Sequence, residues 1–236
     1  MIRALIVDDE IHAREELSLL LEETGEVEIV GSCANALEAV KAINRLRPQV
    51  LFLDIQMPLI GGFELLSMID EEIMPHVVFV TAYDEYALKA FEEKTLDYLL
   101  KPVAPERLRK SLEKLRSALR SGAPGAYETV SLSRIPCVSA NRIKLIEPHS
   151  VEYVHSDLSG VHVVTSQGSF FTELTLKVLE DRTGLLRCHR QFLVNLDQVD
   201  EILLLDSGLA EIRTKSDQSL PVSRRYLKSL KDRLHL

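Results

Sequence analysis

The chain has 236 residues, 46% of them hydrophobic and 27% charged, and a formal net charge of -8 at pH 7. This length allows one large or two small domains with buried cores, and ten glycines and nine prolines exclude a collagen-like or low-complexity chain. No apolar run reaches the roughly 18 residues of a membrane span. Acidic residues also follow the first apolar run too early for a signal peptide, so we expect a cytoplasmic protein with no membrane contact.

The first half of the chain alternates short apolar runs with amphipathic stretches. The apolar runs are rich in β-branched residues or leucine and predict buried strands at Ile2–Val7, Val27–Cys33, Val50–Leu53, Val77–Val80 and Tyr98–Leu100. Helical periodicity is found near residues 12–24, 36–47, 62–71, 84–93 and 104–119. Strands that are each followed by a helix predict an α/β domain with a doubly wound, five-stranded parallel sheet.

The helical pattern ends after Arg120, and the small, breaker-rich stretch Ser121–Ala126 follows. We therefore predict a linker at residues 117–136, between a first domain at residues 3–116 and a second domain at residues 137–236. The second domain is predicted to be mainly β. Its expected strands include Ser150–His155, Val161–Thr165, Val199–Leu205 and Ala210–Thr214, and its expected helices are Leu174–Asp181 and Arg224–Leu234.

The charge is unevenly distributed between the two halves. Residues 1–122 contain 14 Lys and Arg against 22 Asp and Glu, whereas residues 123–236 contain 14 of each kind. The last 22 residues contain six basic and two acidic side chains. This asymmetry suggests two units with different partners.

The cysteines are Cys33, Cys137 and Cys188. Their number is odd and no Cys/His pair has the spacing of a zinc site, which favours free thiols in a reducing compartment. We therefore expect neither a disulfide framework nor a structural zinc site.

Polar side chains follow the predicted parallel strands at their carboxyl ends. Asp8 and Asp9 follow the first strand, Asp54 the third, Thr81 ends the fourth and Lys101 follows the fifth. Ligands of parallel α/β sheets bind at this edge. We therefore expect these side chains to converge on one site, although each acid alone could be an ordinary solvated loop residue.

Three carboxylates this close together need a counter-charge, because otherwise at least one of them would stay protonated. Mg²⁺ fits, since it takes oxygen ligands from one or two carboxylates together with phosphate oxygens. With the cation bound, Asp54 can attack a phosphoryl group and form an acyl phosphate. Lys101 and Thr81 can bind the phosphoryl oxygens, while Asp9 is the expected direct metal ligand and Asp8 acts directly or through water.

A phosphatase with an aspartyl nucleophile is an alternative. Those enzymes resemble each other in a DxD arrangement whose second acid works as an acid/base catalyst, but here Asp54 is followed two residues later by Gln56. The phosphorylated form should then hydrolyse slowly, which suits a signal better than a turnover enzyme.

The first half carries four motifs that together resemble response-regulator receiver domains. They are LIVDDE at 5–10, LFLDIQMP at 51–58, VTA at 80–82 and YLLKP at 98–102. The resemblance covers the predicted first domain and implies a flavodoxin-like fold, Asp54 as the phospho-acceptor and a sensor histidine kinase as the phosphoryl donor.

The same resemblance implies further roles. The Gln56 backbone carbonyl matches the third protein ligand of Mg²⁺, beside the acidic residues. Thr81 and Lys101 match the switch hydroxyl and the invariant lysine, and the bond from Lys101 to Pro102 matches one that is cis in the family. Tyr98 matches an aromatic switch, although it could instead be an aromatic residue packed in the sheet.

Polar side chains in the second domain gather in three clusters, at Ser156–Gly160, Arg187–Gln191 and Val222–Lys228. Arginine suits bidentate contact with guanine, and Asn, Gln, Ser and Lys can bind base edges or phosphates. A β domain can present such residues from loops. Each cluster alone could equally be a solvated surface, and a net-neutral domain is unusual for a DNA binder.

The stretches LLRCHRQFLVNLDQV at 185–199 and LPVSRRYLKSL at 220–230 resemble the LytTR DNA-binding domain. That family has mostly antiparallel strands whose loops enter successive major grooves. Its resemblance to residues 137–236 implies DNA contacts from His189, Arg190, Asn195, Arg224, Arg225, Lys228 and Ser159. His189 and Asn195 could instead be structural, and Gly160 stands where the family sometimes has a bulkier polar residue.

Together the two resemblances predict a two-component response regulator and not an enzyme. A sensor histidine kinase would phosphorylate Asp54 with Mg²⁺ as cofactor, and the chain would bind double-stranded promoter DNA, as a homodimer formed on phosphorylation or on DNA, to regulate transcription. An output domain that binds RNA or protein is the alternative. The adjacent Phe170 and Phe171 argue against RNA, because neighbouring residues of a strand point to opposite faces and form no stacking surface.

Overall fold

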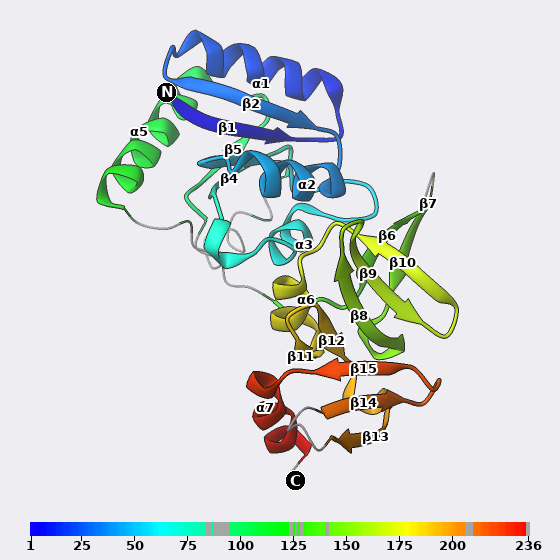
Figure 1. Ribbon diagram of the computed structural model, residues 1–236. Coiled ribbons are helices and arrows are strands. Elements are labelled where there is room, and N and C mark those ends of the chain that lie inside the picture. Colours follow the sequence, from blue (N-terminus) through cyan, green and yellow to red (C-terminus); the bar gives the residue numbers. More distant parts are fainter. Residues whose placement is uncertain are drawn as a thin grey trace. The chain divides into compact units, whose positions relative to one another are not determined.

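The structure is a computed structural model that describes residues 1–83, 86, 95–122, 125, 127, 130–139, 142–205 and 210–234. The chain forms two compact units, Met1–Val130 and Ser131–Leu236. Figure 1 shows the helices and strands of each unit. The first is α/β and the second mainly β, as the sequence predicts.

A five-stranded parallel sheet forms the centre of the first unit, with the strand order β2-β1-β3-β4-β5. All five predicted strands are present, and the last two are slightly longer than predicted. The direction of winding reverses between β1 and β3, which makes the sheet doubly wound. The strands are β1 (Ile2–Val7), β2 (Val27–Cys33), β3 (Val50–Leu53), β4 (His76–Thr81) and β5 (Asp97–Leu100).

Helices cover both faces of this sheet. Leu21 of α1 (Ile11–Glu23) and Leu112 of α5 (Pro105–Ser121) belong to one buried cluster with alternate strand residues such as Phe52. The intervening strand residues point to the opposite face. There α2 (Ala36–Leu46) contacts β1, β2 and α3 (Gly62–Ser67).

Local sequence explains where α2 begins and ends. The Asn35 side chain accepts a hydrogen bond from the Glu38 backbone N–H at 3.0 Å, and the Glu38 carboxylate accepts one from Ala34 N–H, also at 3.0 Å. The pair resembles a capping box, except that Glu38 binds the N–H of the residue before the N-cap. The helix ends at Leu46, because the left-handed backbone of the next residue, Arg47 (φ 49°), stops further α-helical bonding.

The third predicted helix, at residues 62–71, is shorter in the structure. α3 ends at Ser67, and a separate 3₁₀ turn, η1, covers Glu71–Ile73. The Asp70 carboxylate accepts a hydrogen bond from the Glu72 backbone N–H at 3.0 Å and so starts the new turn. The helix predicted at residues 84–93 falls on a stretch of which only Tyr86 is described.

The second unit contains two antiparallel sheets. Seven strands have the order β11-β12-β8-β9-β10-β6-β7, and three have the order β13-β14-β15. The strands are β6 (Ile135–Ser139), β7 (Arg142–Ile146), β8 (Val151–Asp157), β9 (Gly160–Thr165), β10 (Gly168–Thr172), β11 (Leu186–His189), β12 (Phe192–Val194), β13 (Val199–Leu204), β14 (Ala210–Thr214) and β15 (Ser219–Val222).

Two helices pack on these sheets. α6 (Leu176–Thr183) contacts β8 and β12, and α7 (Arg224–Leu234) contacts β11. Leu230 of α7 is buried in a cluster with Cys188 and with Ile212 of the small sheet. The 3₁₀ turns η2 (Pro148–Ser150) and η3 (Leu196–Gln198) complete the unit.

α6 begins two residues later than predicted, because the Thr175 side chain caps it by accepting a hydrogen bond from Val178 N–H at 3.2 Å. The last helix, α7, has the predicted bounds.

α5 extends to Ser121 and β6 starts at Ile135. Both elements overlap the expected linker at 117–136, whose bounds stay a prediction.

All three cysteines are free and buried, so the predicted free thiols are confirmed. Burial raises the pKa of Cys33 to about 11 and the pKa values of Cys137 and Cys188 to about 12. The three thiols are therefore protonated at neutral pH.

Candidate functional site

The carboxyl ends of the parallel strands bring the predicted acidic residues together. One ligand atom from each of Asp8, Asp9 and Asp54 lies within 4.8 Å of the other two. Asp8 and Asp54 are only 4% and 6% exposed, whereas Asp9 is exposed to solvent. β1 and β3 are neighbours in the sheet, which explains why residues far apart in sequence meet here.

Lys101, which follows β5, reaches into this acidic cluster. Its Nζ lies 2.6 Å from Asp8 Oδ2, 3.0 Å from Asp54 Oδ2 and 3.7 Å from Glu10 Oε2. The bond from Lys101 to Pro102 is cis, as the resemblance implies. Glu10 was not among the predicted site residues, although its place directly after the acidic pair could have suggested it.

The electrostatics of the site reflect burial and charge together. Burial raises the pKa of Asp8, and the nearby Asp54 carboxylate raises it further, against the opposing hydrogen bonds from Lys101 and from the Glu10 backbone. Burial lowers the pKa of Lys101, but its hydrogen bonds to Asp8 and Asp54 outweigh burial, and the net shift is upward. One ammonium group among four carboxylates leaves the site negative, which is the environment a divalent cation needs.

Gly62 is a site residue that the sequence reasoning missed. A Cβ atom at this position would lie 2.4 Å from the Asp54 backbone oxygen. The Gly62 N–H donates a hydrogen bond to the Ile55 carbonyl at 2.8 Å. The first turn of α3 therefore lies directly against the backbone that carries Asp54, and only glycine permits this approach.

Thr81 and Tyr98 lie on the neighbouring strands β4 and β5. Thr81 is fully buried, and its Oγ1 has no hydrogen-bond partner among the residues that the structure describes. The Tyr98 hydroxyl donates a hydrogen bond to the Tyr83 carbonyl, and its ring meets Phe79 edge-on at 6.5 Å between centroids. Gln56 donates a hydrogen bond from its side chain to the Tyr86 hydroxyl at 3.1 Å.

Two predicted contact loops of the second unit lie side by side. The β8–β9 turn and the β11–β12 turn are joined where Ser156 N–H donates to the Gln191 carbonyl at 2.9 Å. The Gln191 side chain donates back to the Ser156 carbonyl at 3.3 Å. Arg190, in the second turn, is exposed. His189 accepts a hydrogen bond at Nδ1 from Gln191 N–H at 3.2 Å, so it shapes this turn.

A row of aromatic and histidine rings crosses the strands behind these turns. Centroid distances are 5.8 Å from His189 to Phe192, 6.1 Å from Phe192 to His155, 5.1 Å from His155 to His162 and 5.9 Å from His162 to Phe171. The five rings come from β11, β12, β8, β9 and β10 in turn. The contacts fix the relative positions of the strands that carry both turns.

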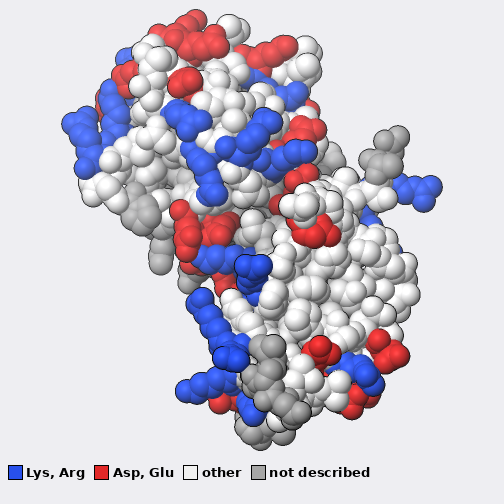
Figure 2. Space-filling model, viewed as in Figure 1, with Lys and Arg blue, Asp and Glu red and all other residues white. Residues whose placement is uncertain are grey.

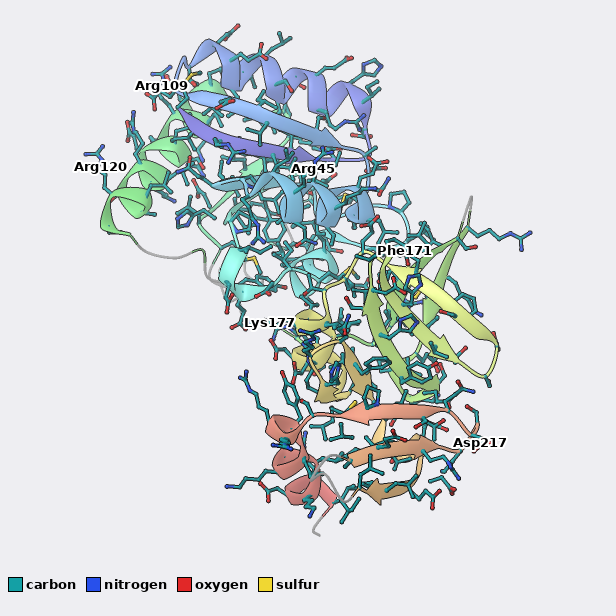
Figure 3. The ribbon with its side chains drawn as sticks, viewed as in Figure 1. Arg45, Arg109, Arg120, Phe171, Lys177 and Asp217 are labelled. Carbon is teal, nitrogen blue, oxygen red and sulfur yellow. The ribbon has the colours of Figure 1, made fainter. Side chains whose placement is uncertain are left out.

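Ser159 lies in the β8–β9 turn and is held by its neighbours. Asp157 Oδ1 accepts hydrogen bonds from the Ser159 N–H at 2.8 Å and from its hydroxyl at 2.6 Å. The next residue, Gly160, has φ +126°, and a Cβ there would lie 2.5 Å from the Phe171 ring, which Figure 3 labels on β10. This contact explains why glycine stands where the family sometimes has a bulkier residue.

Asn195 is placed differently from the other predicted DNA contacts. It is 9% exposed, and its amide donates to the Val151 carbonyl at 2.8 Å and to the His149 carbonyl at 3.3 Å. Its side-chain oxygen accepts from Asp197 N–H at 3.0 Å. The side chain is thus used inside the unit, where it caps η3.

The predicted basic residues of α7 are on the surface. Arg224, Arg225 and Lys228 are exposed, and Figure 2 shows Lys and Arg side chains gathered over this helix. Ser223 directly precedes the helix. Its carbonyl accepts hydrogen bonds from the third and fourth helical residues, and its N–H donates to the Cys188 carbonyl at 3.0 Å. α7 is therefore anchored to β11.

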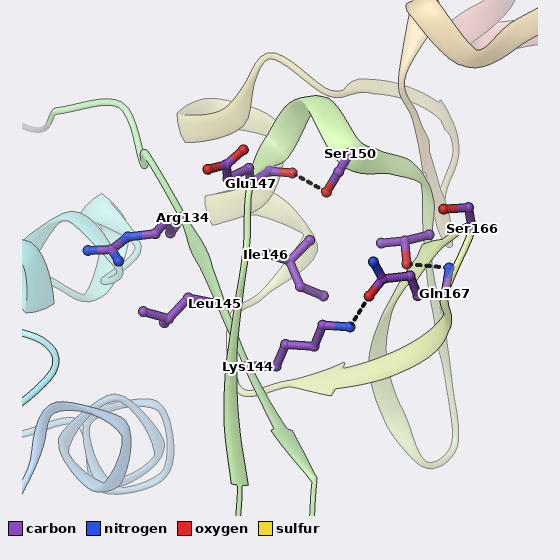
Figure 4. A pocket seen from close by; sticks show the side chains of 9 residues that line it. Arg134, Lys144, Leu145, Ile146, Glu147, Ser150, Ser166 and Gln167 are labelled. Carbon is purple, nitrogen blue, oxygen red and sulfur yellow. Dashed lines mark hydrogen bonds between the residues drawn. The ribbon is translucent and has the colours of Figure 1, made fainter.

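A cavity of about 380 Å³ also lies in the second unit, beside β7 (Figure 4). Its lysine, Lys144, donates a hydrogen bond to Gln167 Oε1 at 2.6 Å and lies 3.9 Å above the Phe170 ring. The ammonium group is therefore already engaged within the unit. None of the helices in the described ranges is long and apolar enough to cross a membrane.

Family comparisons agree with both halves. The model of the response regulator receiver domain matches residues 4–113, and that of the LytTr DNA-binding domain matches residues 141–235. A crystal structure of the response regulatory domain of protein mrkE from Klebsiella pneumoniae is 36% identical, with a TM-score of 0.46, and covers 51% of this chain and 99% of that one.

Full-length relatives match along the whole chain. An uncharacterized response regulatory protein of Vibrio cholerae is 54% identical over 99% of both chains. The transcriptional regulatory protein BtsR of Salmonella typhi is 52% identical over 100% of both chains. The stretches FTELTLKVLEDRT at 171–183 and PVSRRYLKSL at 221–230 predict similarity to the BtsR type, and these matches confirm it.

Proposed function

The chain belongs to the LytTR family of two-component response regulators, which regulate transcription, and from this premise we propose that a sensor histidine kinase phosphorylates it on Asp54. The observation that carries the proposal is the position of Asp54, buried beside Asp8 with one carboxylate oxygen 3.0 Å from Lys101 Nζ. A nucleophile that accepts a phosphoryl group needs a nearby cation to balance the negative charge of that group. The Lys101 ammonium group is such a cation.

Mg²⁺ is the cofactor that these residues suit. Asp8, Asp9 and Asp54, with the backbone carbonyl of Gln56, would hold it, since hard oxygen donors are the ligands it prefers. When bound, the cation would offset negative charge on the transferred phosphoryl group.

The protein's own residues account for the transfer. A carboxylate oxygen of Asp54 attacks the phosphorus, the bond from phosphorus to the donor nitrogen breaks, and an acyl phosphate forms. Lys101 then binds one phosphoryl oxygen. The Thr81 hydroxyl, which has no partner among the described residues, donates a hydrogen bond to another, which would move Thr81 and let Tyr98 repack. Position 56 carries a glutamine and not an acid that could activate water, so we expect the acyl phosphate to hydrolyse slowly.

We propose that phosphorylation changes the face that includes β5 and that this face then forms a homodimer, on DNA or before it. Two copies of the second domain can then bind two half-sites of promoter DNA, with a gain in effective concentration. Arg190, Arg224, Arg225, Lys228, His189 and Ser159 form the proposed contact surface. We leave Asn195 out, since its amide is buried and fully used. We also propose a cytoplasmic location, because a regulator of transcription must reach promoter DNA.

Labelling with acetyl phosphate tests the proposal. The wild-type chain should take up acid-labile phosphate in the presence of Mg²⁺ and then bind promoter DNA more tightly. Asp54→Asn should lose both responses, whereas Glu23→Gln, which removes an exposed acid of α1, should keep them. Stoichiometric labelling of Asp54→Asn would show that another residue accepts the phosphoryl group.

A further inference from the structure

The β8–β9 turn presents one apolar side chain to solvent. Asp157 pairs with Gly160 across the hairpin, so Leu158 and Ser159 form its tip. Leu158 has a relative exposure of 109%, so no described part of the chain covers it. A single exposed leucine is unremarkable by itself, and the significance of this one depends on its surroundings.

The turn that carries Leu158 is rigid. Ser159 donates two hydrogen bonds to Asp157 Oδ1, and its hydroxyl is also hydrogen-bonded to His162 Nε2 at 2.7 Å. Gly160 packs against the Phe171 ring, which fixes the base of the hairpin from β10. These contacts fix the backbone on both sides of Leu158, so the turn itself needs little ordering when Leu158 binds a partner.

The turn lies directly beside the proposed arginine contact. The paired hydrogen bonds between Ser156 and Gln191 join it to the β11–β12 turn, where Arg190 is exposed. Arginine reads guanine edges in the major groove. Leu158 is therefore presented close to a side chain that suits base recognition.

The chemistry of the tip points to a base edge and not to the phosphate backbone. Leucine has no hydrogen-bond donor, and the half-exposed Asp157 carboxylate at the base of the tip would repel a phosphate. In the major groove the apolar feature that a base pair offers is the 5-methyl group of thymine.

We propose that Leu158 is a specificity-determining residue that packs on the 5-methyl group of a thymine, next to the base pairs contacted from the β11–β12 turn. This inference rests on the proposed DNA-binding function and adds that Leu158 recognises a thymine. It predicts that binding depends on the 5-methyl group of that thymine, which uracil lacks.

Replacement of thymine by uracil tests this. The full-length chain, phosphorylated with acetyl phosphate, is used to select a duplex from a random-sequence pool, and each thymine of that duplex is then replaced singly by uracil. At one thymine of each half-site the replacement should weaken binding by the wild type about fourfold, the factor for one buried methyl-sized group. Leu158→Ala should bind the thymine duplex more weakly and show no further loss with uracil at that position.

Leu204→Ala is the matched control, because Leu204 of β13 is also an exposed leucine of the second unit, at 62%. It should discriminate thymine from uracil as the wild type does. If Leu158→Ala and the wild type discriminate thymine from uracil equally at every position, the role of Leu158 is wrong, although the proposed DNA-binding function still stands. If the phosphorylated wild type selects no duplex, the proposed DNA-binding function fails and the inference fails with it.

Discussion

Thr81 and Asn195 are both buried polar residues, but the structure uses their side chains in opposite ways. Asn195 makes three hydrogen bonds inside the second unit. The Thr81 hydroxyl has no partner in the described part of the first unit. A buried hydroxyl without a partner costs free energy until a ligand or a conformational change provides one. Thr81 is therefore placed to respond to a phosphoryl group, whereas Asn195 is placed to hold the fold.

Replacement of Asn195 separates these two kinds of role. We expect Asn195→Ala to lower the free energy of unfolding by about 1–3 kcal/mol, because it leaves the Val151 carbonyl and the Asp197 N–H without their partner. Urea unfolding of the full chain measures this. Unchanged stability together with lost DNA affinity would instead make Asn195 a direct DNA contact.

His155 gives the second unit a dependence on pH. Burial lowers the pKa of His155, and the neighbouring His162 lowers it further, against the opposing effect of Asp157. Its partners from the other strands are the Phe192 ring and His162. Since the unfolded chain takes up the proton more readily, stability is fully present above the ordinary pKa of about 6.5 and falls as the pH drops below it.

Thermal melting at about pH 7 and about pH 5 checks this effect. We expect His155→Gln to lose part of the decrease in melting temperature that the wild type shows between these conditions. His149→Gln is the control, because the His149 side chain is 77% exposed and interacts with Glu147 at the surface. An equal decrease in His155→Gln and the wild type would contradict the assignment.

At the level of elements, the close approach of α3 to the Asp54 backbone leaves no room for a side chain at Gly62. Gly62→Ala would place a methyl group 2.4 Å from the Asp54 carbonyl oxygen. We expect a loss of about 1–3 kcal/mol in unfolding free energy, together with slower phosphate uptake as the acceptor loop shifts. Unfolding by urea and labelling by acetyl phosphate measure the two effects.

Gly25→Ala is the comparison for this variant. Gly25 also adopts a backbone that alanine disfavours (φ +66°), but nothing lies within 4 Å of its Cβ position. It should cost about 1 kcal/mol of stability from backbone strain alone and leave phosphate uptake normal. Normal uptake by Gly62→Ala would show that α3 does not control the acceptor loop.

The strands of the first unit could be predicted well because each one is encoded by a short stretch of sequence. The strands are short apolar runs with a reactive residue at the end, and the sheet edge then brings Asp8, Asp54 and Lys101 together. The break after α3 could not be read from periodicity, because it depends on Asp70 as the start of a new turn. The Gly62 contact depends on the approach of two backbones and has no periodic signal.

Prediction was weaker for the second unit because its function depends on pairing over long sequence distances. Ser156 and Gln191 are 35 residues apart, yet their hydrogen bonds place two turns side by side. Asn195 is polar and follows a conspicuous motif, so the sequence alone suggested a surface contact as readily as an internal one. Its burial follows from the packing of η3 on β8, which no local pattern encodes.

Across the whole molecule, charge is divided according to the proposed roles. The excess of acids lies in residues 1–122, and the balanced second half has basic side chains concentrated in its last 22 residues. DNA affinity should therefore depend on a few exposed cations of α7 and on Arg190 of the β11–β12 turn. It should also fall steeply with salt.

Two substitutions separate base reading from phosphate binding. Arg224→Ala should weaken binding to the selected promoter about tenfold while changing nonspecific affinity less. Lys228→Ala should weaken all sequences alike and lower the salt slope by about one. Affinity measured against salt concentration checks both, with the exposed Arg109 of α5 replaced by alanine as control. If neither variant differs from that control, α7 is not part of the contact surface.

The placement of the three thiols has a practical consequence. Cys33 lies in the first unit, Cys137 and Cys188 in the second, and each is buried with a raised pKa. An alkylating reagent reacts with the thiolate and needs access to it, so these groups are inert until the surrounding unit opens. The rate at which each thiol is alkylated thus reports how often its own unit opens. The unfolding of the two units can therefore be measured separately in the native chain, without any engineered label.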